Sequence, residues 1–279
     1  MATKRYVLLF MFLFGILLLP KVWPDSQPQR IISLGPSLTK GLYLLGVQDK
    51  LIANTIYCIE PEDARRKEKI GTVVKTNVDK VLALKPDLVL ATSLLDPKEK
   101  EKLTSLGIRV VSFSTPKNFD AICGQFLELG LLVGKEDKAR KIVEDAKDEV
   151  ARLKEKVKKL PRPKVLIQVG ARPLVVAPGN YFINDYIEFA GGINVAQETR
   201  EGIYSREWVL KINPEIIIIT TMGMAAEKEK SEWTKYKTLS AARFGRIYIM
   251  DTDKITSPTP VSFVKALADF ARIFHPELD

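Results

Sequence analysis

The chain has 279 residues, of which 46% are hydrophobic and 28% charged, and its formal net charge is +9. This length and hydrophobic content can form two globular domains with real cores, and they exclude an intrinsically disordered chain. The basic residues of Lys135–Lys164 alternate with acids, which is typical of a solvated helix face, so nucleic acid is not expected as a partner.

The N-terminus has the pattern of a secretory signal, because Lys4 and Arg5 precede the apolar run Tyr6–Leu19. This run is shorter than the about 20 residues that a bilayer-spanning helix needs. Residues 20–25 offer no small-x-small cleavage site, and no cysteine follows the run to carry a lipoprotein anchor. We expect residues 1–29 to be a signal or anchor segment with a linker, and the protein to be exported to the periplasm or another extracytoplasmic site. Whether the segment is cleaved or retained as an anchor stays open.

The chain contains an internal repeat. Residues 77–93 (NVDKVLALKPDLVLATS) and residues 205–221 (SREWVLKINPEIIIITT) align without a gap. In each copy an amphipathic helix ends before a proline, and a continuous apolar run follows, Leu88–Ala91 in the first copy and Ile216–Ile219 in the second. Short runs that are apolar on both faces and alternate with helices indicate a parallel sheet covered on both sides.

The repeat extends beyond these stretches. The strand expected at 31–35 is matched by one at 165–170, each followed by a helix that ends in glycine, and the Gly turn and strand of 106–111 are matched at 244–249. The two halves are therefore expected to be lobes with the same order of elements.

Between the halves, residues 136–160 carry apolar residues at uninterrupted spacings of three and four, which predicts one long helix with one apolar stripe. At 1.5 Å per residue this helix would be about 35 Å long and could cross from one lobe to the other. A coiled-coil dimer is the competing interpretation, but alanines in the seam would make a weak zipper, and we expect a monomer. The predicted fold is α/β, with two similar lobes of mainly parallel sheet flanked by helices, 30–135 and 161–279, joined by the bridging helix 136–160.

Two cysteines, Cys58 and Cys123, are present. In an exported chain an even pair can form a disulfide, and two buried free thiols are the alternative.

The residues that catalysis would need are missing. The chain has neither a glycine-rich phosphate loop nor a Gly-x-Ser-x-Gly motif. His275 is the only histidine, four residues from the C-terminus, and we interpret it as a surface residue at the end of the last helix. No enzymatic activity, metal site or cofactor is expected.

A ligand cleft is expected instead, because ligands of open α/β sheets bind beyond the carboxyl ends of the strands. Two such lobes joined by a helix would face each other at those ends. Aromatic, methionine and arginine side chains there suit a large, partly apolar ligand with negative or carbonyl groups. The candidate ligand-binding residues are Pro36, Ser37, Tyr57, Ser93, Arg172, Tyr181, Arg200, Tyr204 and Met222.

Several motifs, each weak alone, together resemble the periplasmic cobalamin and ferric-siderophore (iron-chelate) binding proteins of ABC importers. The resemblance covers residues 30–277. The motifs are IISLGPS at 31–37, Tyr57-Cys58 before Pro61, VDKVLALKPDLV at 78–89, GGINV at 191–195, SRE at 205–207 and RIY at 246–248.

The resemblance implies two lobes bridged by a rigid helix, a ligand held between them, and only modest closure on binding. It also implies that one acid on each lobe, here Asp79 and Glu207, docks onto arginines of a permease dimer that works with separate ATPase subunits. Lobes related by pseudo-twofold symmetry would present equivalent acids to a twofold-symmetric partner. The alternative, compatible with docking, is that both acids only stabilise helix N-termini.

The chain departs from the family pattern at three points. Lys40 stands where the family usually has glutamate, Asp79 replaces the commoner glutamate, and the lipoprotein cysteine is missing.

The motif Tyr57-Cys58 before Pro61 is similar to the cobalamin branch, so a corrinoid is the first ligand expected. Ferric siderophore or haem comes next, and Arg172 and Arg200 keep a metal oxyanion open. An enzyme or cofactor-scaffold subunit on a similar fold would need more cysteine and histidine ligands. A membrane-anchored sensor, docking through the same two acids, is the remaining alternative.

Overall fold

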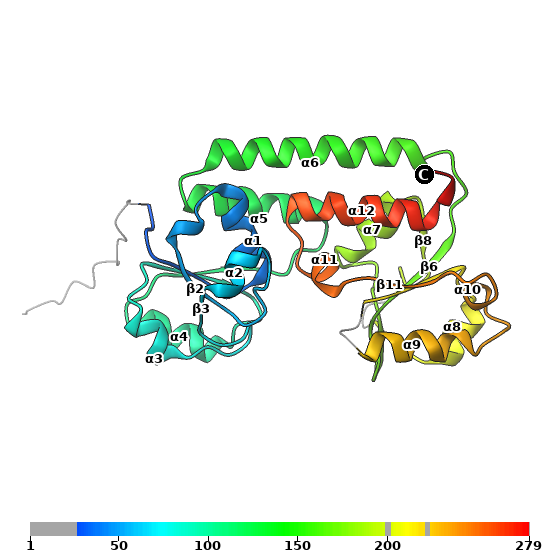
Figure 1. Cartoon of the computed structure of the whole chain (residues 1–279), viewed down its shortest axis with the longest axis horizontal. Helices are drawn as coiled ribbons and strands as arrows, with labels where there is room; N and C mark the ends of the chain where they lie inside the picture. The colour runs from blue at the N-terminus through cyan, green and yellow to red at the C-terminus, as the bar shows by residue number, and fades with distance from the viewer. Residues whose placement is uncertain (1–26, 199–201, 221–223, 279) are drawn as a thin grey trace, which may run out of the picture.

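The structure is a computed structural model that describes residues 27–198, 202–220 and 224–278 (Figure 1). The predicted signal, Tyr6–Leu19, lies outside the described residues. No helix within the described ranges combines the length and the apolar composition that a bilayer crossing needs.

The first lobe is a five-stranded parallel sheet in the order β3-β2-β1-β4-β5. The repeat copy at 77–93 contributes the interior strand β4, between β1 and β5, in which the predicted apolar run is buried. Its strands are β1 (Ile31–Ser33), β2 (Leu51–Asn54), β3 (Glu68–Lys69), β4 (Leu88–Thr92) and β5 (Val110–Phe113). Its helices are α1 (Pro36–Leu45), η1 (Gln48–Lys50), α2 (Glu62–Arg66), α3 (Val78–Ala83), α4 (Pro97–Ser105) and α5 (Phe119–Leu132).

The second lobe has the sheet order β11-β10-β6-β7-β9, with β8 beside β6. Its strands are β6 (Lys164–Gly170), β7 (Leu174–Val176), β8 (Ile193–Asn194), β9 (Ile203–Tyr204), β10 (Ile216–Ile219) and β11 (Ile247–Ile249). Its helices are α7 (Ile183–Phe189), α8 (Arg206–Ile212), α9 (Met224–Thr234), α10 (Ser240–Arg243), α11 (Thr252–Thr256), α12 (Pro260–Phe274) and η2 (Pro276–Leu278).

The two lobes share a core of three parallel strands, β1-β4-β5 in one and β6-β10-β11 in the other. This confirms the prediction of two similar, mainly parallel α/β lobes. The order of elements is not the same throughout, because β7 runs antiparallel to β6. The connection of three residues between them, Ala171, Arg172 and Pro173, is too short for the crossover that a parallel strand requires.

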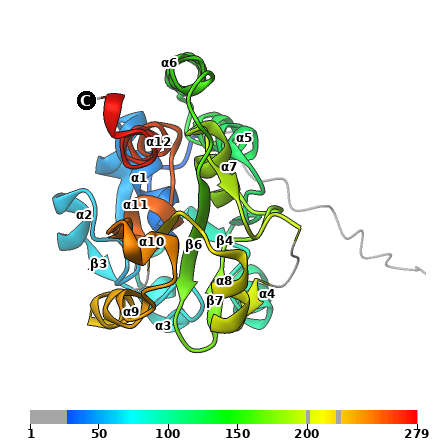
Figure 2. The same ribbon diagram turned by 90° about the vertical axis from the view of Figure 1, so that its right-hand side faces the viewer.

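The predicted bridging helix is α6 (Glu136–Val157), which spans both lobes above α5 and α12 (Figures 1 and 2). Its predicted stripe is buried at Ala139, Val143, Ala146, Val150 and Val157. The stripe packs against α5 and α12 of the same chain. Because those neighbours already cover it, the stripe needs no second copy to bury it.

The two copies of the repeat end their helices in the same way. Lys85 and Asn213, each directly before a proline, adopt left-handed backbone conformations with φ of 45° and 50°. A left-handed residue terminates a helix, and the following proline disfavours its continuation. The acid after each proline links the strand that follows it to a neighbouring strand. The Asp87 carboxylate, before β4, accepts hydrogen bonds at 3.1 Å from Arg30 N, before β1, and Glu215, before β10, accepts one at 3.1 Å from Lys164 N of β6.

Cys58 and Cys123 are both buried free thiols, so the disulfide that the sequence left open is not formed. The Cys58 Sγ atom lies 3.2 Å from Thr39 Oγ1, while Cys123 belongs to α5. Burial raises the pKa of the Cys123 thiol to about 12.

Both thiols should resist modification in the native protein, because they are buried and the thiolate is the reactive form. We expect no alkylation by iodoacetamide under native conditions and two alkylated cysteines after denaturation without reductant. Mass spectrometry of the two samples makes the test, and a denatured chain that gains label only after reduction would restore the disulfide.

His275 is buried with 1% exposure, so its interpretation as a surface residue is wrong. Its Nε2 atom lies 2.9 Å from the carbonyl oxygen of Ala190, and the ring packs where Gly191 has no side chain. The position near the chain end suggested exposure, and only the packing of the C-terminus against the end of α7 buries the ring.

Candidate functional site

A cleft of about 520 Å³ lies between the lobes. The first lobe contributes the ends of β1, β4 and β5, the loops after β2 and β3, and one face of α5. The second lobe contributes Tyr181, Phe182 and seven residues of the segment 252–260, Lys254 and Ile255 not among them. Its lining residues are Pro36, Ser37, Leu38, Tyr57, Val73, Thr92, Leu94, Phe113, Ser114, Thr115, Pro116, Ile122, Gln125, Phe126, Leu129, Tyr181, Phe182, Thr252, Asp253, Thr256, Ser257, Pro258, Thr259 and Pro260.

The cleft has an apolar floor and a polar rim. Leu38, Phe113, Ile122, Phe126 and Leu129 are buried members of the main hydrophobic core and also line the cleft. Apart from the Asp253 carboxylate, the polar groups are neutral, and most are hydroxyls. They come from Ser37, Thr92, Ser114, Thr115, Gln125, Thr252, Thr256, Ser257 and Thr259.

Four of the predicted residues line the cleft: Pro36, Ser37, Tyr57 and Tyr181. Ser93 lies between two lining residues, but its hydroxyl pairs with Thr115 Oγ1 at 3.0 Å. Pro36, Ser37 and Tyr57 of the first lobe lie at the cleft because the parallel strands of that lobe bring their carboxyl ends to one edge of the sheet.

Two predicted residues are not in the cleft. Arg172 sits in the tight β6–β7 connection, and Tyr204 belongs to β9, where its ring lies against Trp208 with centroids 3.9 Å apart. Neither lines the cleft, because the antiparallel β7 and β9 form the far edge of the sheet. Arg200 and Met222 lie outside the described residues, and their roles remain predictions.

The segment that the sequence did not single out is 252–260, which forms α11 and the start of α12. It supplies most of the second lobe's share of the lining. It follows β11 directly, so the carboxyl-end rule could have found it once that strand was recognised.

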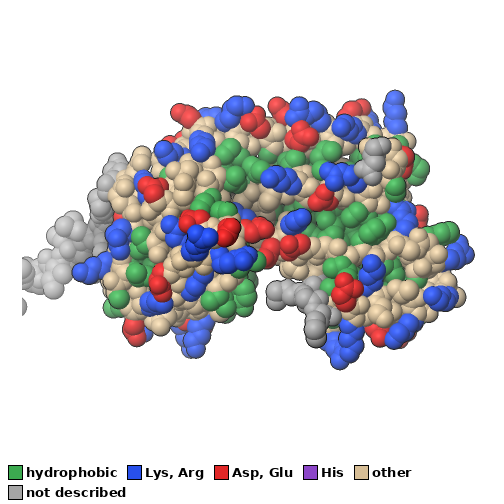
Figure 3. Space-filling model, in the orientation of Figure 1, with side chains coloured by type: hydrophobic (Ala, Val, Ile, Leu, Met, Phe, Trp, Pro, Cys, Tyr) green, Lys and Arg blue, Asp and Glu red, His purple; other side chains and the backbone are tan. Residues whose placement is uncertain are grey.

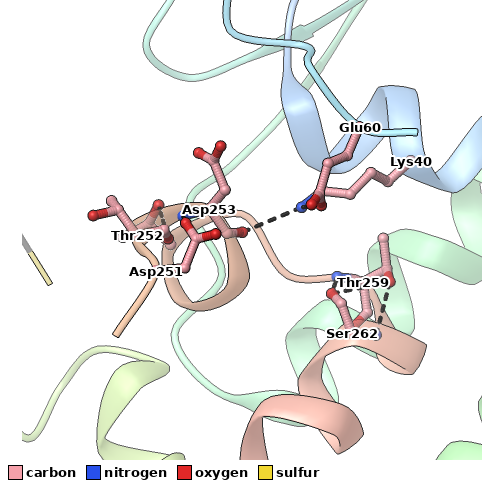
Figure 4. Close-up of polar contacts among 8 residues, drawn as sticks. Lys40, Glu60, Asp251, Thr252, Asp253, Thr259 and Ser262 are labelled. Carbon is pink, nitrogen blue, oxygen red and sulfur yellow. Dashed lines mark hydrogen bonds and ion pairs between the residues drawn. The ribbon is translucent and has the colours of Figure 1, made fainter. Parts of the chain in front are cut away.

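Acidic side chains lie at the second-lobe wall of the cleft, and Lys40 of the first lobe reaches toward them (Figure 4). Among the described residues of the lining, Asp253 carries the carboxylate, and none is a lysine or an arginine. Burial raises the pKa of Asp253, the neighbouring Asp251 raises it further, and Lys40 opposes the shift. Burial also raises the pKa of Tyr181, which therefore stays a neutral phenol near neutral pH.

Large apolar side chains are exposed at the mouth of the cleft. Tyr57 and Leu94 line it and are 43% and 57% exposed, and the surface is hollowed between the lobes (Figure 3). Exposed apolar groups that converge on a concave surface are typical of a ligand site.

The two acids of the repeat are exposed and occupy equivalent places. Asp79 belongs to the first turn of α3 and Glu207 to the first turn of α8. The N-cap of α3 is Asn77, and that of α8 is Ser205. Hydrogen bonds from its own backbone N–H and from Ser205 lower the pKa of Glu207. Both helices lie on the side of the lobes away from α6 (Figure 1).

No group of three or more His, Cys, Asp or Glu side chains within residues 27–198, 202–220 and 224–278 is arranged to hold a metal ion.

Two α/β lobes, a helical layer that joins them and a cleft between them define a two-lobed solute-binding protein. The profile of the periplasmic binding protein family matches residues 31–253, and the chain belongs to this family. It is a substrate-binding protein of the kind that serves ABC importers.

Three similar proteins illustrate the range of proteins that this chain resembles. An uncharacterized ABC transporter substrate-binding lipoprotein of Bacillus subtilis, YvrC, is 28% identical over 90% of this chain and 82% of its own length. The vitamin B12-binding protein of Yersinia pestis (strain Pestoides F) is 28% identical over 75% of this chain and 76% of its own. The structure of a periplasmic heme-binding protein from Pseudomonas aeruginosa superposes with a TM-score of 0.77 at 25% identity, covering 89% of this chain and 93% of that one.

Proposed function

We propose that this protein captures a corrinoid of the cobalamin type in the cleft and delivers it to an ABC permease. The supporting observation is the lining: an apolar floor, neutral hydroxyl and amide groups, and no lysine or arginine among its described residues. A corrinoid carries neutral amide side chains around a large ring, so hydroxyls can pair with the amides while the ring covers apolar surface.

Anionic ligands fit this lining less well. Haem brings two carboxylates, and ferric catecholates and metal oxyanions are also negative, so each would meet the Asp253 carboxylate in a lining whose described residues include no lysine or arginine. Arg172, which suggested an oxyanion, lies outside the cleft. The vitamin B12-binding relative supports the corrinoid, and a neutral ferric hydroxamate siderophore is the second candidate because it meets the same requirement.

The delivery step would use the two exposed acids. Asp79 and Glu207 would each contact one permease subunit, with the twofold arrangement of the repeat matching that of the partner. The N-terminal segment would direct the protein out of the cytoplasm and could hold it at the membrane if retained.

A direct binding test separates the ligands. Purified protein is titrated with cyanocobalamin, dicyanocobinamide, a neutral ferric hydroxamate and haemin, by calorimetry and by absorbance after gel filtration. We expect a corrinoid to bind with a dissociation constant of about 1 μM or tighter, and haemin to bind at least tenfold more weakly. Retention of haemin alone would reject the corrinoid and also the argument from charge.

A further inference from the structure

Lys40 joins three separate pieces of the cleft wall. It belongs to α1, which brings Ser37 and Leu38 to the cleft. Its Nζ atom donates a hydrogen bond to the backbone carbonyl of Asp253 on α11 of the second lobe at 3.2 Å. The same atom lies 3.7 Å from Glu60 Oε2, on the loop that carries Tyr57 (Figure 4).

The side chain of Lys40 is largely buried, so its ammonium group depends on these contacts. Its side chain is 11% exposed, whereas that of Glu60 is 50% exposed. A buried ammonium group loses its hydration and is stabilised only by partners at close range. Because one partner lies in the other lobe, the ammonium group is satisfied only while the lobes stay close together.

The surroundings of Lys40 are acidic on both lobes. Glu60 belongs to the first lobe and Asp251 and Asp253 to the second, and both Glu60 and Asp251 act electrostatically on Asp253. Without the ammonium group these carboxylates would repel one another across the lobe boundary. Lys40 therefore contributes a hydrogen bond between the lobes and also screens a repulsion that would separate them.

Other contacts hold α11 in its own lobe. Helix α11 has five residues, and its N-cap is Asp251. The Thr252 hydroxyl donates to the Thr220 carbonyl, and Ile255 is buried. The Thr252 bond holds α11 within the second lobe, and the bond from Lys40 ties it to the first lobe.

The geometry points to Lys40 as a positioning residue that clasps the two lobes at the cleft and holds α11 and the Tyr57 loop at the distance where both contact one ligand. The clasp deepens the proposed function, since its effect on ligand release rests on that function. The effect of Lys40 on the spacing of the lobes does not depend on the proposed function.

The spacing test uses ligand-free protein. Spin labels on cysteines introduced at Glu101 of α4 and at Lys237, between α9 and α10, report the distance between the lobes, and both positions are exposed. Helices α4 and α9 lie on the side of the lobes away from α6 (Figure 1). We expect a single narrow distance distribution for the otherwise unchanged chain. Lys40→Met should shift it to longer distances and broaden it, and Lys40→Arg, which keeps the charge and the donors, should restore it.

Two controls separate the clasp from a general charge or folding effect. Lys254→Met removes the same charge next to Asp253, but Lys254 is exposed and should leave the distances unchanged. Adding Glu60→Gln to Lys40→Met removes one repelling carboxylate and should bring the distribution back toward that of the parent. The clasp is rejected if Lys40→Met matches the parent, or if Lys254→Met opens the lobes as much.

A second experiment tests the effect of Lys40 on the ligand by measuring the dissociation rate of cyanocobalamin. We expect Lys40→Met to release it about tenfold faster, while the association rate changes by less than threefold. If the parent protein binds no cyanocobalamin, the proposed ligand fails, and the distance measurement still decides the clasp. If the distances change and the release rate does not, the clasp positions the lobes but not the ligand.

Discussion

Reversing the charge of both Asp79 and Glu207 to lysine should abolish the stimulation of the importer's ATPase by loaded binding protein. Both side chains are exposed, at equivalent places on the two lobes, and neither lines the cleft. Ligand affinity should therefore stay within about twofold, because the reversed charges are screened from the cleft by solvent. Each single reversal should give an intermediate loss, since one contact with the permease would remain.

Reversing the two acids also has a small effect on the stability of helices α3 and α8. An exposed acid in a first helical turn stabilises the helix only modestly through the helix dipole, so the double variant should remain folded. The matched control reverses Glu128 on α5 and Glu144 on α6, two exposed acids elsewhere on the surface. Undiminished stimulation by the Asp79 and Glu207 variant, with ligand binding intact, would leave both acids with a purely structural role.

Replacing Tyr181 by alanine should weaken corrinoid binding by about 10- to 100-fold, equivalent to about 1.4–2.8 kcal/mol. Tyr181 lines the cleft from the second lobe, and its ring lies against Phe182 with centroids 4.5 Å apart. A ring that is already packed on its own lobe loses little freedom when a ligand covers it. Calorimetric titration with cyanocobalamin measures the loss.

Two further substitutions define what Tyr181 supplies. Tyr181→Phe keeps the ring and should cost less than about fivefold, in line with the modest net value of one neutral hydrogen bond. Tyr204→Ala removes a ring that the sequence also placed in the site but that packs on Trp208 away from the cleft. It should change affinity by less than threefold. An equal loss for Tyr204→Ala and Tyr181→Ala would mean that the ligand does not occupy this cleft.

The repeat shows why much of the fold could be predicted. An amphipathic helix, a left-handed residue, a proline, an acid and an apolar run each follow local rules, and both copies obey them. The one feature of the repeat that local rules could not explain was the acid after the proline. Asp87 and Glu215 accept hydrogen bonds from the backbone at the start of the neighbouring strand, which is distant in sequence.

The site was predicted in the first lobe better than in the second. Pro36, Ser37 and Tyr57 follow parallel strands whose carboxyl ends meet at the cleft. In the second lobe the three-residue connection at Arg172 makes a hairpin and displaces Tyr204 to the far edge of the sheet. A hairpin and a crossover connection can begin with the same residues, so the alternation of strand and helix patterns in the sequence did not reveal which connection follows β6.

The sequence by itself determined the two-lobed α/β fold, the long helix between the lobes and the equivalence of Asp79 and Glu207, because these depend on periodicity and on local chain stereochemistry. Only the tertiary structure decided that the cysteines stay apart, that His275 is buried, and that Lys40 of the first lobe meets Asp253 of the second. Those outcomes depend on contacts between residues far apart in the chain. Such contacts arise when the lobes pack against a shared helical layer, and no short stretch of sequence encodes that packing.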